Sequence, residues 1–150
     1  MPVREQQYVK VHEGDTLAIA FAKRVALSPI AVAYREYDAA EQLWQPHTWT
    51  QTAEQAGRVR AALEAEGLVP GDRVAIMLRN CRAWVWLDQG AIAQGLVTVP
   101  LFVDDRPDNI AYCINDAGVK LLFVEGSEHL KRLEPSIRGV VPFRHTIRRP

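Results

Sequence analysis

The stretch RVAIMLRNCRAWVWLDQGAIAQGLVTVPLFVDDRPDNIAYCINDAGVKLLFVEG, residues 73–126, decides the fold. Three short apolar runs, 74–78, 97–102 and 121–124, alternate with two segments of helical periodicity. A continuous apolar run is typical of a strand covered on both faces, because a strand with one solvated face alternates apolar and polar residues. Strands that alternate with helices form right-handed βαβ units. The stretch therefore predicts an α/β fold with a doubly wound, mainly parallel sheet and helices on both faces.

The helices expected between these strands have recognisable ends. The first is predicted over 83–94, with Asn80 as its cap. The second is predicted over 107–117 and begins with a proline, whose fixed φ angle suits the first helical position. Gly118 follows it, and we expect a left-handed backbone there because a strand begins almost at once. Two further elements would extend the unit: a helix over 127–133 and a strand over 143–147.

The residues before this unit predict a helix and a β-hairpin, together spanning 15–49. Apolar residues recur every four positions in the helical segment 15–28. The two expected strands are 30–35 and 43–49, and Pro46 confines the second to an edge or a bulge. This segment is therefore expected to form a helix and a β-hairpin that precede the βαβαβ unit of about 73–126.

A long helix is expected to join the hairpin to the first buried strand. It opens at Thr50 or Thr52, and Thr52 has Gln55 at capping-box spacing. Its apolar face ends at Gly67, which we expect to supply a left-handed cap.

Length and charge restrict the class of protein. The chain has 150 residues, so one domain over 1–150 is expected. Its 18 basic and 18 acidic side chains give a net charge of zero, so no overall electrostatic field attracts nucleic acid. The longest uncharged stretch, residues 89–103, is shorter than the ~20 residues of a spanning helix. The polar first eight residues resemble no signal peptide. The expected location is the cytoplasm, either free or peripheral to a membrane.

The residue types that form metal or phosphate sites are scattered. Gly90 and Gly95 have the spacing of a phosphate loop, but Leu96 and Val97 follow where lysine and serine or threonine are needed. The cysteines are expected to be small buried hydrophobes, and the terminal basic cluster a solvated charge run. We therefore assign no catalytic residue, no cofactor-binding residue and no metal ligand within the chain. The histidines, cysteines and basic cluster considered are His12, His47, His129, His145, Cys81, Cys113, Arg144, Arg148 and Arg149.

Several short blocks follow one another in order along the chain: Thr16-Leu17, Phe21, Val25, Ser28-Pro29, Ala33-Tyr34, Thr48-Trp49-Thr50, Gly67, Pro70-Gly71-Asp72-Arg73-Val74-Ala75-Ile76, Asn80, Trp84-Val85, Asp88, Gly95, Val97-Thr98-Val99-Pro100 and Ile110-Ala111-Tyr112 with Asn115-Asp116-Ala117-Gly118-Val119-Lys120. The order of these blocks resembles the N-terminal region of adenylate-forming acyl-CoA synthetases, closest to the long-chain fatty-acid branch. The resemblance covers about residues 16–126, and the ordered run is more specific than any one block. Val103 and Asp104 depart from it, since the family has proline and then threonine or serine there.

The resemblance implies an activity for the family. Such enzymes use ATP and Mg²⁺ to convert a carboxylate to an acyl-adenylate and then transfer the acyl group to coenzyme A. The family's phosphate loop, adenine motif, ribose-binding aspartate, hinge and C-terminal lysine do not occur in this sequence. The chain is therefore expected to be the front part of a fatty acyl-CoA synthetase, truncated by nature or by design and inactive alone. Its partners would be the remainder of the synthetase and, in the parent enzyme, a fatty acid.

Several tempting residues have structural interpretations. At least one of Trp84 and Trp86 is expected to pack in the core, between the sheet and a neighbouring helix. Asp88 is expected to form a hydrogen bond with a loop backbone. Asp72 and Arg73 follow a Pro-Gly turn and are expected to fix the entry into the strand. Activity in the isolated chain would redirect the search for ATP ligands to Asp88, Asp104 and Asp105.

Two alternatives from other classes stay open at this point. One is a self-standing binding module that holds a nucleotide or flavin at the switch point of its sheet, although it would lack a phosphate loop. The other is an interaction domain that self-associates through the unpaired edge of an incomplete sheet. Nucleotide titration would identify the first, and sedimentation at several concentrations would identify the second.

Overall fold

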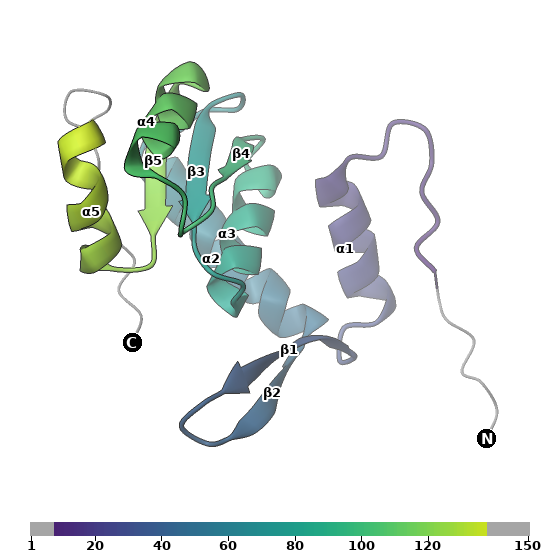
Figure 1. The fold of residues 1–150 in the computed structure, drawn as a ribbon. Coiled ribbons are helices and arrows are strands. Elements are labelled where there is room, and N and C mark those ends of the chain that lie inside the picture. Colours follow the sequence, from purple (N-terminus) through teal and green to yellow (C-terminus); the bar gives the residue numbers. More distant parts are fainter. Residues whose placement is uncertain (1–7, 138–150) are drawn as a thin grey trace. The chain divides into compact units, whose positions relative to one another are not determined.

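The computed structural model describes residues 8–137, and it divides the chain into two compact units, Met1–Gln55 and Ala56–Pro150 (Figure 1). The expected strand over 143–147 and the basic cluster at 144–149 lie outside the described residues. No helix in the described range is both long enough and apolar enough to cross a membrane.

The first unit begins with helix α1, Leu17–Leu27. Thr16 caps it, because its hydroxyl accepts a hydrogen bond from the Ile19 N–H at 3.3 Å. Strands β1, Val32–Asp38, and β2, Leu43–Thr48, then form an antiparallel hairpin. The strand β1 starts later than the expected 30–35, since the Ala31 N–H turns back to the Ser28 carbonyl. Pro46 lies on a strand of a two-stranded sheet, where each strand is an edge, as expected.

Helix α2, Trp49–Ala65, opens earlier than predicted. The Gln51 N–H donates to the Thr48 hydroxyl at 3.2 Å, and the Thr48 N–H donates to the Gln51 side chain at 2.9 Å. These two bonds form the capping box, so its assignment to Thr52 and Gln55 was wrong. Helix α2 ends as expected, with Gly67 at a φ angle of 78°.

The second unit contains a parallel sheet with the strand order β4-β3-β5. Its strands are β3, Arg73–Met77, β4, Val97–Pro100, and β5, Val119–Val124. Helix α3, Arg82–Ala93, joins β3 to β4, and α4, Pro107–Asp116, joins β4 to β5. Helix α5, Ser127–Ile137, follows β5 and continues beyond the predicted end at Leu133. The doubly wound α/β fold with a preceding helix and hairpin is confirmed.

Buried side chains of β3 alternate between the two faces of the sheet. Val74 and Ile76 pack with α3 and Leu63 of α2 on one face. Ala75 and Met77 pack with α4 and α5 on the other. All four have an exposed fraction of 0%. The continuous apolar run therefore has the predicted cause, a strand covered on both sides.

Two local details correct the expected caps and burial. Asn80 does not cap α3, because the N-cap position is Cys81, which makes no side-chain cap bond. Cys81 and Cys113 are only partly buried, so the expectation of two buried cysteines was wrong. Gly118 has a φ angle of 58°, as predicted for the end of α4.

Candidate functional site

The carboxyl ends of the parallel strands lie together at one edge of the sheet. The chain passes from β3 to β4 and then returns past β3 to β5. Consequently α3 and α5, which follow the neighbouring strands β3 and β5, pack on opposite faces. In open α/β sheets, ligands bind outside the carboxyl ends at such a reversal of strand order. This edge is the candidate functional site of the described chain.

Arg79 and Glu125 meet at the reversal. The Arg79 N–H donates to Glu125 Oε2 at 3.4 Å, and Arg79 Nε lies 3.9 Å from the same oxygen. The Arg79 side chain is 63% exposed, whereas that of Glu125 is 15% exposed. The guanidinium therefore has donors directed to solvent that can bind a carboxylate or phosphate, while Glu125 lowers the local positive charge. The pair acts as a link between the ends of β3 and β5.

The loop that follows β4 is held by a side chain from α5. Arg132 donates to the carbonyl oxygen of Val103 and, at 3.2 Å, to that of Asp105. Asp105 Oδ1 in turn accepts from the Arg106 N–H at 2.7 Å and from the Asn109 side chain at 3.1 Å. The loop with the departing residues Val103 and Asp104 is thus fixed by Arg132 and by the bonds of Asp105.

Phe102 is the exposed residue of this loop. Its exposed fraction is 84%, although the next residue, Val103, is buried at 9%. An exposed aromatic side chain on an anchored loop offers an apolar contact at the candidate edge.

At the opposite edge of the sheet, Asp72 holds the entry into β3. Its Oδ1 lies 2.6 Å from Lys120 Nζ, and its Oδ2 accepts from the Val69 N–H at 3.0 Å. The hydrogen bond from Lys120, followed by that from Val69, holds the pKa of the Asp72 carboxyl below its usual value. The predicted role of Asp72 at the strand entry is thereby confirmed.

Arg73 ties the same edge to the end of α4. Its Nε donates to the Ala117 carbonyl at 2.7 Å, and its remaining nitrogens donate to the carbonyls of Gly118 at 2.9 Å and Gly71 at 3.2 Å. The bonds to Ala117 and Gly118 satisfy carbonyl groups that follow the last turn of α4. Arg73 therefore has the structural role predicted for it.

Asp88 connects α3 to β4. Its Oδ1 accepts from the Thr98 hydroxyl at 3.0 Å, and its Oδ2 accepts from the Gln89 side chain at 3.2 Å. The partner is a side chain of the next strand, so the expected loop backbone was wrong. Asp88 and Thr98 meet because α3 leads directly into β4, so this strand starts close to the helix.

The two tryptophans of α3 have different surroundings. Trp84 is partly buried against the core that contains Leu63 and Leu87, as expected. Trp86 lies 5.7 Å from the guanidinium carbon of Arg82, measured to the ring centroid. Its indole Nε1 is buried and forms no hydrogen bond with any residue in the described range. The Arg82 guanidinium thus makes a cation–π contact with the Trp86 ring.

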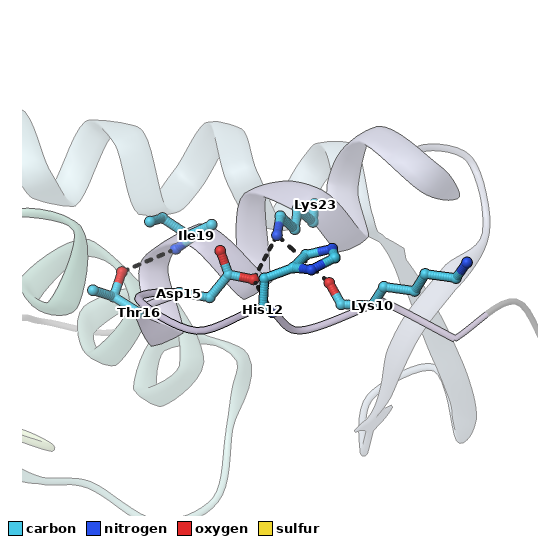
Figure 2. A network of polar contacts seen from close by, with 6 residues as sticks. All are labelled: Lys10, His12, Asp15, Thr16, Ile19 and Lys23. Carbon is cyan, nitrogen blue, oxygen red and sulfur yellow. Dashed lines mark hydrogen bonds and ion pairs between the residues drawn. The ribbon is translucent and has the colours of Figure 1, made fainter.

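A polar network in the first unit fixes the segment before α1 (Figure 2). Asp15 Oδ2 lies 2.5 Å from Lys23 Nζ and accepts from the His12 N–H at 2.7 Å. Lys23 also donates to the Lys10 carbonyl at 3.5 Å. The bond from Lys23, and after it that from His12, lowers the pKa of the Asp15 carboxyl. The side chains engage one another, so the network is structural.

The potential metal ligands of residues 8–137 do not gather at one place. Within that range, no three His, Cys, Asp or Glu side chains gather in a way that could hold a metal ion. Asp104 and Asp105 lie in the loop after β4, where the Asp105 carboxylate is engaged with Arg106 and Asn109.

The candidate residues expected from the sequence did not include Arg79, Glu125 or Arg132. Arg79 and Glu125 stand directly after the apolar runs 74–78 and 121–124. Polar residues that follow buried parallel strands lie at the ligand-binding edge, so this signal was available. Arg132 carried no comparable signal.

Comparison with known proteins identifies the family. The sequence model of the AMP-binding enzyme family matches residues 21–146. The chain therefore belongs to the AMP-binding enzyme family, and it corresponds to the N-terminal region of AMP-forming acyl-CoA ligases.

Individual relatives agree with this assignment. The chain is 32% identical over 132 residues to the long-chain-fatty-acid–CoA ligase FadD15 of Mycobacterium bovis, and the match covers 88% of the chain and 22% of FadD15. It is 26% identical to the protein Rv1549 of Mycobacterium tuberculosis, with 96% of the chain and 78% of Rv1549 covered. The fold matches a solved fatty acyl-CoA synthetase of M. tuberculosis with a TM-score of 0.71 at 24% identity, covering 86% of the chain and 25% of that structure. The chain thus spans about a fifth of the named ligase.

Proposed function

We propose that this chain is the N-terminal scaffold of an ATP-dependent, AMP-forming fatty acyl-CoA synthetase and is inactive alone. The match to the AMP-binding family over residues 21–146 carries the proposal. The likeness to a long-chain-fatty-acid–CoA ligase supports a fatty acid as the parent's substrate. In this role the parent enzyme would use ATP, Mg²⁺ and coenzyme A, bound by its remainder. Its location would be the cytoplasm, free or peripheral to a membrane.

The proposed scaffold has two parts, the helix and hairpin of residues 15–49 and the βαβαβ unit of about 73–126. The bonds of the second part support a positioning role. Arg73 and the Asp72–Lys120 pair fix one edge of the sheet, while Arg132 and the Arg79–Glu125 pair fix the loops at the other. A rigid sheet of this kind can hold the neighbouring parts of an enzyme at fixed positions.

Pyrophosphate exchange tests the proposed inactivity of the chain. Adenylation requires ATP phosphates to be held in line with the attacking carboxylate, and the sequence has no phosphate loop for this purpose. We expect no fatty-acid-dependent exchange of labelled pyrophosphate into ATP, and a Kd for ATP no tighter than ~1 mM. Full-length FadD15 assayed in parallel with the same panel of fatty acids is the positive control. Acid-dependent exchange by the isolated chain would contradict the proposal.

A chimera tests the scaffold role directly. Residues 21–146 replace the matching segment of FadD15, and fatty-acid-dependent pyrophosphate exchange is measured. We expect exchange in this chimera and in its Gly57→Ala form, since Gly57 has open space around its Cα. The Gly90→Val form should lose exchange, because its side chain would collide with Val59. A chimera that folds but shows no exchange would contradict the scaffold role.

A further inference from the structure

Strands β1 and β2 form a two-stranded hairpin (Figure 1), and most side chains on one of its faces are exposed. Cross-strand pairs place Arg35 opposite Pro46 and Tyr37 opposite Trp44, and side chains two residues apart share a face. A register shift between Val32 and Tyr34 brings Val32 to the same side, opposite Thr48. The hairpin face is defined as its exposed members: Val32, Arg35, Tyr37, Trp44 and Pro46.

An aromatic pair forms the centre of the hairpin face. The ring centroids of Tyr37 and Trp44 lie 5.5 Å apart at an interplanar angle of 60°. Tyr37 is 50% exposed and Trp44 is 60% exposed. Tyrosine, tryptophan and arginine are the residues most enriched at the centres of protein interfaces. The composition therefore matches a protein-binding surface with an aromatic core.

Opposite charges flank this aromatic pair. Arg35 lies two residues before Tyr37, about 7 Å along the strand. Glu41 lies in the turn beyond the pair, and the Asp38 carboxylate fixes that turn by accepting from the N–H groups of Ala40 at 2.9 Å and Glu41 at 3.1 Å. Within residues 8–137, the side chains of Arg35 and Glu41 form no ion pair. The hairpin face thus has a cation before the aromatic pair, and the exposed turn beyond the pair carries an anion.

We propose that the hairpin face binds the same face of a second copy of this chain in a two-fold symmetric dimer. A two-fold axis through the Tyr37–Trp44 pair stacks the aromatic pairs of the two copies. The same axis reverses the direction of the second hairpin, so Arg35 of each copy lies against the turn that holds Glu41 of the other. An isologous contact repeats every interaction twice, and both pairings are therefore made together. A face with this charge order is complementary to itself.

Charge reversal tests this arrangement. Sedimentation velocity over a range of concentrations measures the dimer dissociation constant of the full chain. We expect Arg35→Glu and Glu41→Arg each to weaken dimerisation at least tenfold, because each creates two repulsive contacts per dimer. The double variant restores opposite charges and should return to within about threefold of the native constant. Trp44→Ala should also abolish the dimer, whereas Tyr112→Ala, which removes a 68% exposed ring from α4, should not change it.

Each other outcome overturns the proposal. The proposal is wrong if the native chain stays monomeric at the highest concentration. This holds even if the hairpin then binds phosphatidylcholine vesicles, because the partner would be a membrane and not a second copy. The proposal is also wrong if neither Arg35→Glu nor Glu41→Arg changes the dimer dissociation constant. That result would point to association through an edge strand of the parallel sheet. A double variant with a native urea unfolding midpoint also overturns the proposal if its dimer dissociation constant does not return towards the native value.

Discussion

Lys120 and Asp72 form an ion pair of 2.6 Å that joins strand β5 to the turn before β3. The bond from Lys120, with the second from the Val69 N–H, lowers the pKa of the Asp72 carboxyl in the folded state. A carboxyl whose folded pKa lies below its unfolded pKa stabilises the fold above the unfolded value. This contribution disappears as the pH falls from about 3.8 through the folded pKa.

The pH dependence of the Asp72→Asn variant follows from this linkage. We expect its urea midpoint to lie below that of the native chain at pH 7. The difference should shrink as the pH falls below about 3.8, because the native carboxyl then becomes neutral as well. Asp15→Asn serves as a comparison in the first unit, where the Lys23 bond lowers the pKa of Asp15. A difference between native chain and Asp72→Asn that stays constant between pH 7 and pH 2 would contradict the role of the Asp72 charge.

Gly90 permits the close approach of α3 to α2. A Cβ at Gly90 would lie 2.7 Å from Val59 Cγ1 and 2.8 Å from the Ala56 carbonyl oxygen. We expect Gly90→Ala to destabilise the chain by about 1–3 kcal/mol, because overpacking exceeds the gain in helix propensity. Gly57→Ala is the matched control on α2, since its Cβ would meet nothing within 4 Å. It should stabilise the chain by up to about 1 kcal/mol in urea unfolding. Equal effects of the two substitutions would contradict the assigned packing.

Gly118 combines a left-handed backbone with a close side-chain neighbour. Its φ angle is 58°, and a Cβ would lie 2.6 Å from a terminal nitrogen of Arg73. Gly118→Ala should lower the free energy of unfolding by about 1–2 kcal/mol because alanine disfavours a left-handed backbone. Displacement of the Arg73 guanidinium from its hydrogen bonds should lower it further. Gly67→Ala, at a φ angle of 78° with no atom within 4 Å, should cost the backbone part alone. In an Arg73→Ala background the two alanine substitutions should have equal effects on the urea midpoint. A difference that persists there would exclude Arg73 as its cause.

The sequence predicted correctly those features of the fold that depend on neighbouring residues alone. The run 74–78 predicts a strand covered on both faces, and Ala75 and Ile76 are buried on opposite sides. Gly118 follows a helical stripe, and its positive φ angle follows from that position. Each inference needed only the residues within one or two turns.

Other features depended on contacts that sequence periodicity does not specify. Thr48 and Thr52 each have glutamine at capping-box spacing, and pairing of β2 with β1 up to Thr48 decides between them. Arg79 and Glu125 are 46 positions apart in the sequence. They meet because β5 pairs with β3 and not with β4. Strand order is a long-range property. The sequence therefore indicated a switch point only in the alternative of a self-standing binding module, and it did not indicate the residues there.

Arg132 should control the order of the loop after β4. Its bonds to the carbonyls of Val103 and Asp105 cross from α5 to that loop. Hydrogen bonds from a charged donor contribute about 1.5–3 kcal/mol, so their loss should increase local opening by at least tenfold. We expect Arg132→Ala to speed hydrogen exchange at the N–H groups of Asp105 and Arg106, which bond within the loop at 3.3 Å and 2.7 Å.

The matched control for this loop is the neighbouring Lys131→Ala. Lys131 pairs only with Glu128 among the described residues, and their side chains are 68% and 83% exposed. An exposed pair of this kind contributes little to stability, so exchange in the loop should stay at the native rate. Exchange at β3 amides measures global unfolding in both variants and separates it from loop opening. If Arg132→Ala speeds exchange in β3 and in the loop by the same factor, Arg132 stabilises the whole unit and does not specifically order the loop. If neither rate changes, the two bonds contribute nothing to the order of this edge, and Phe102 is not held in place by them.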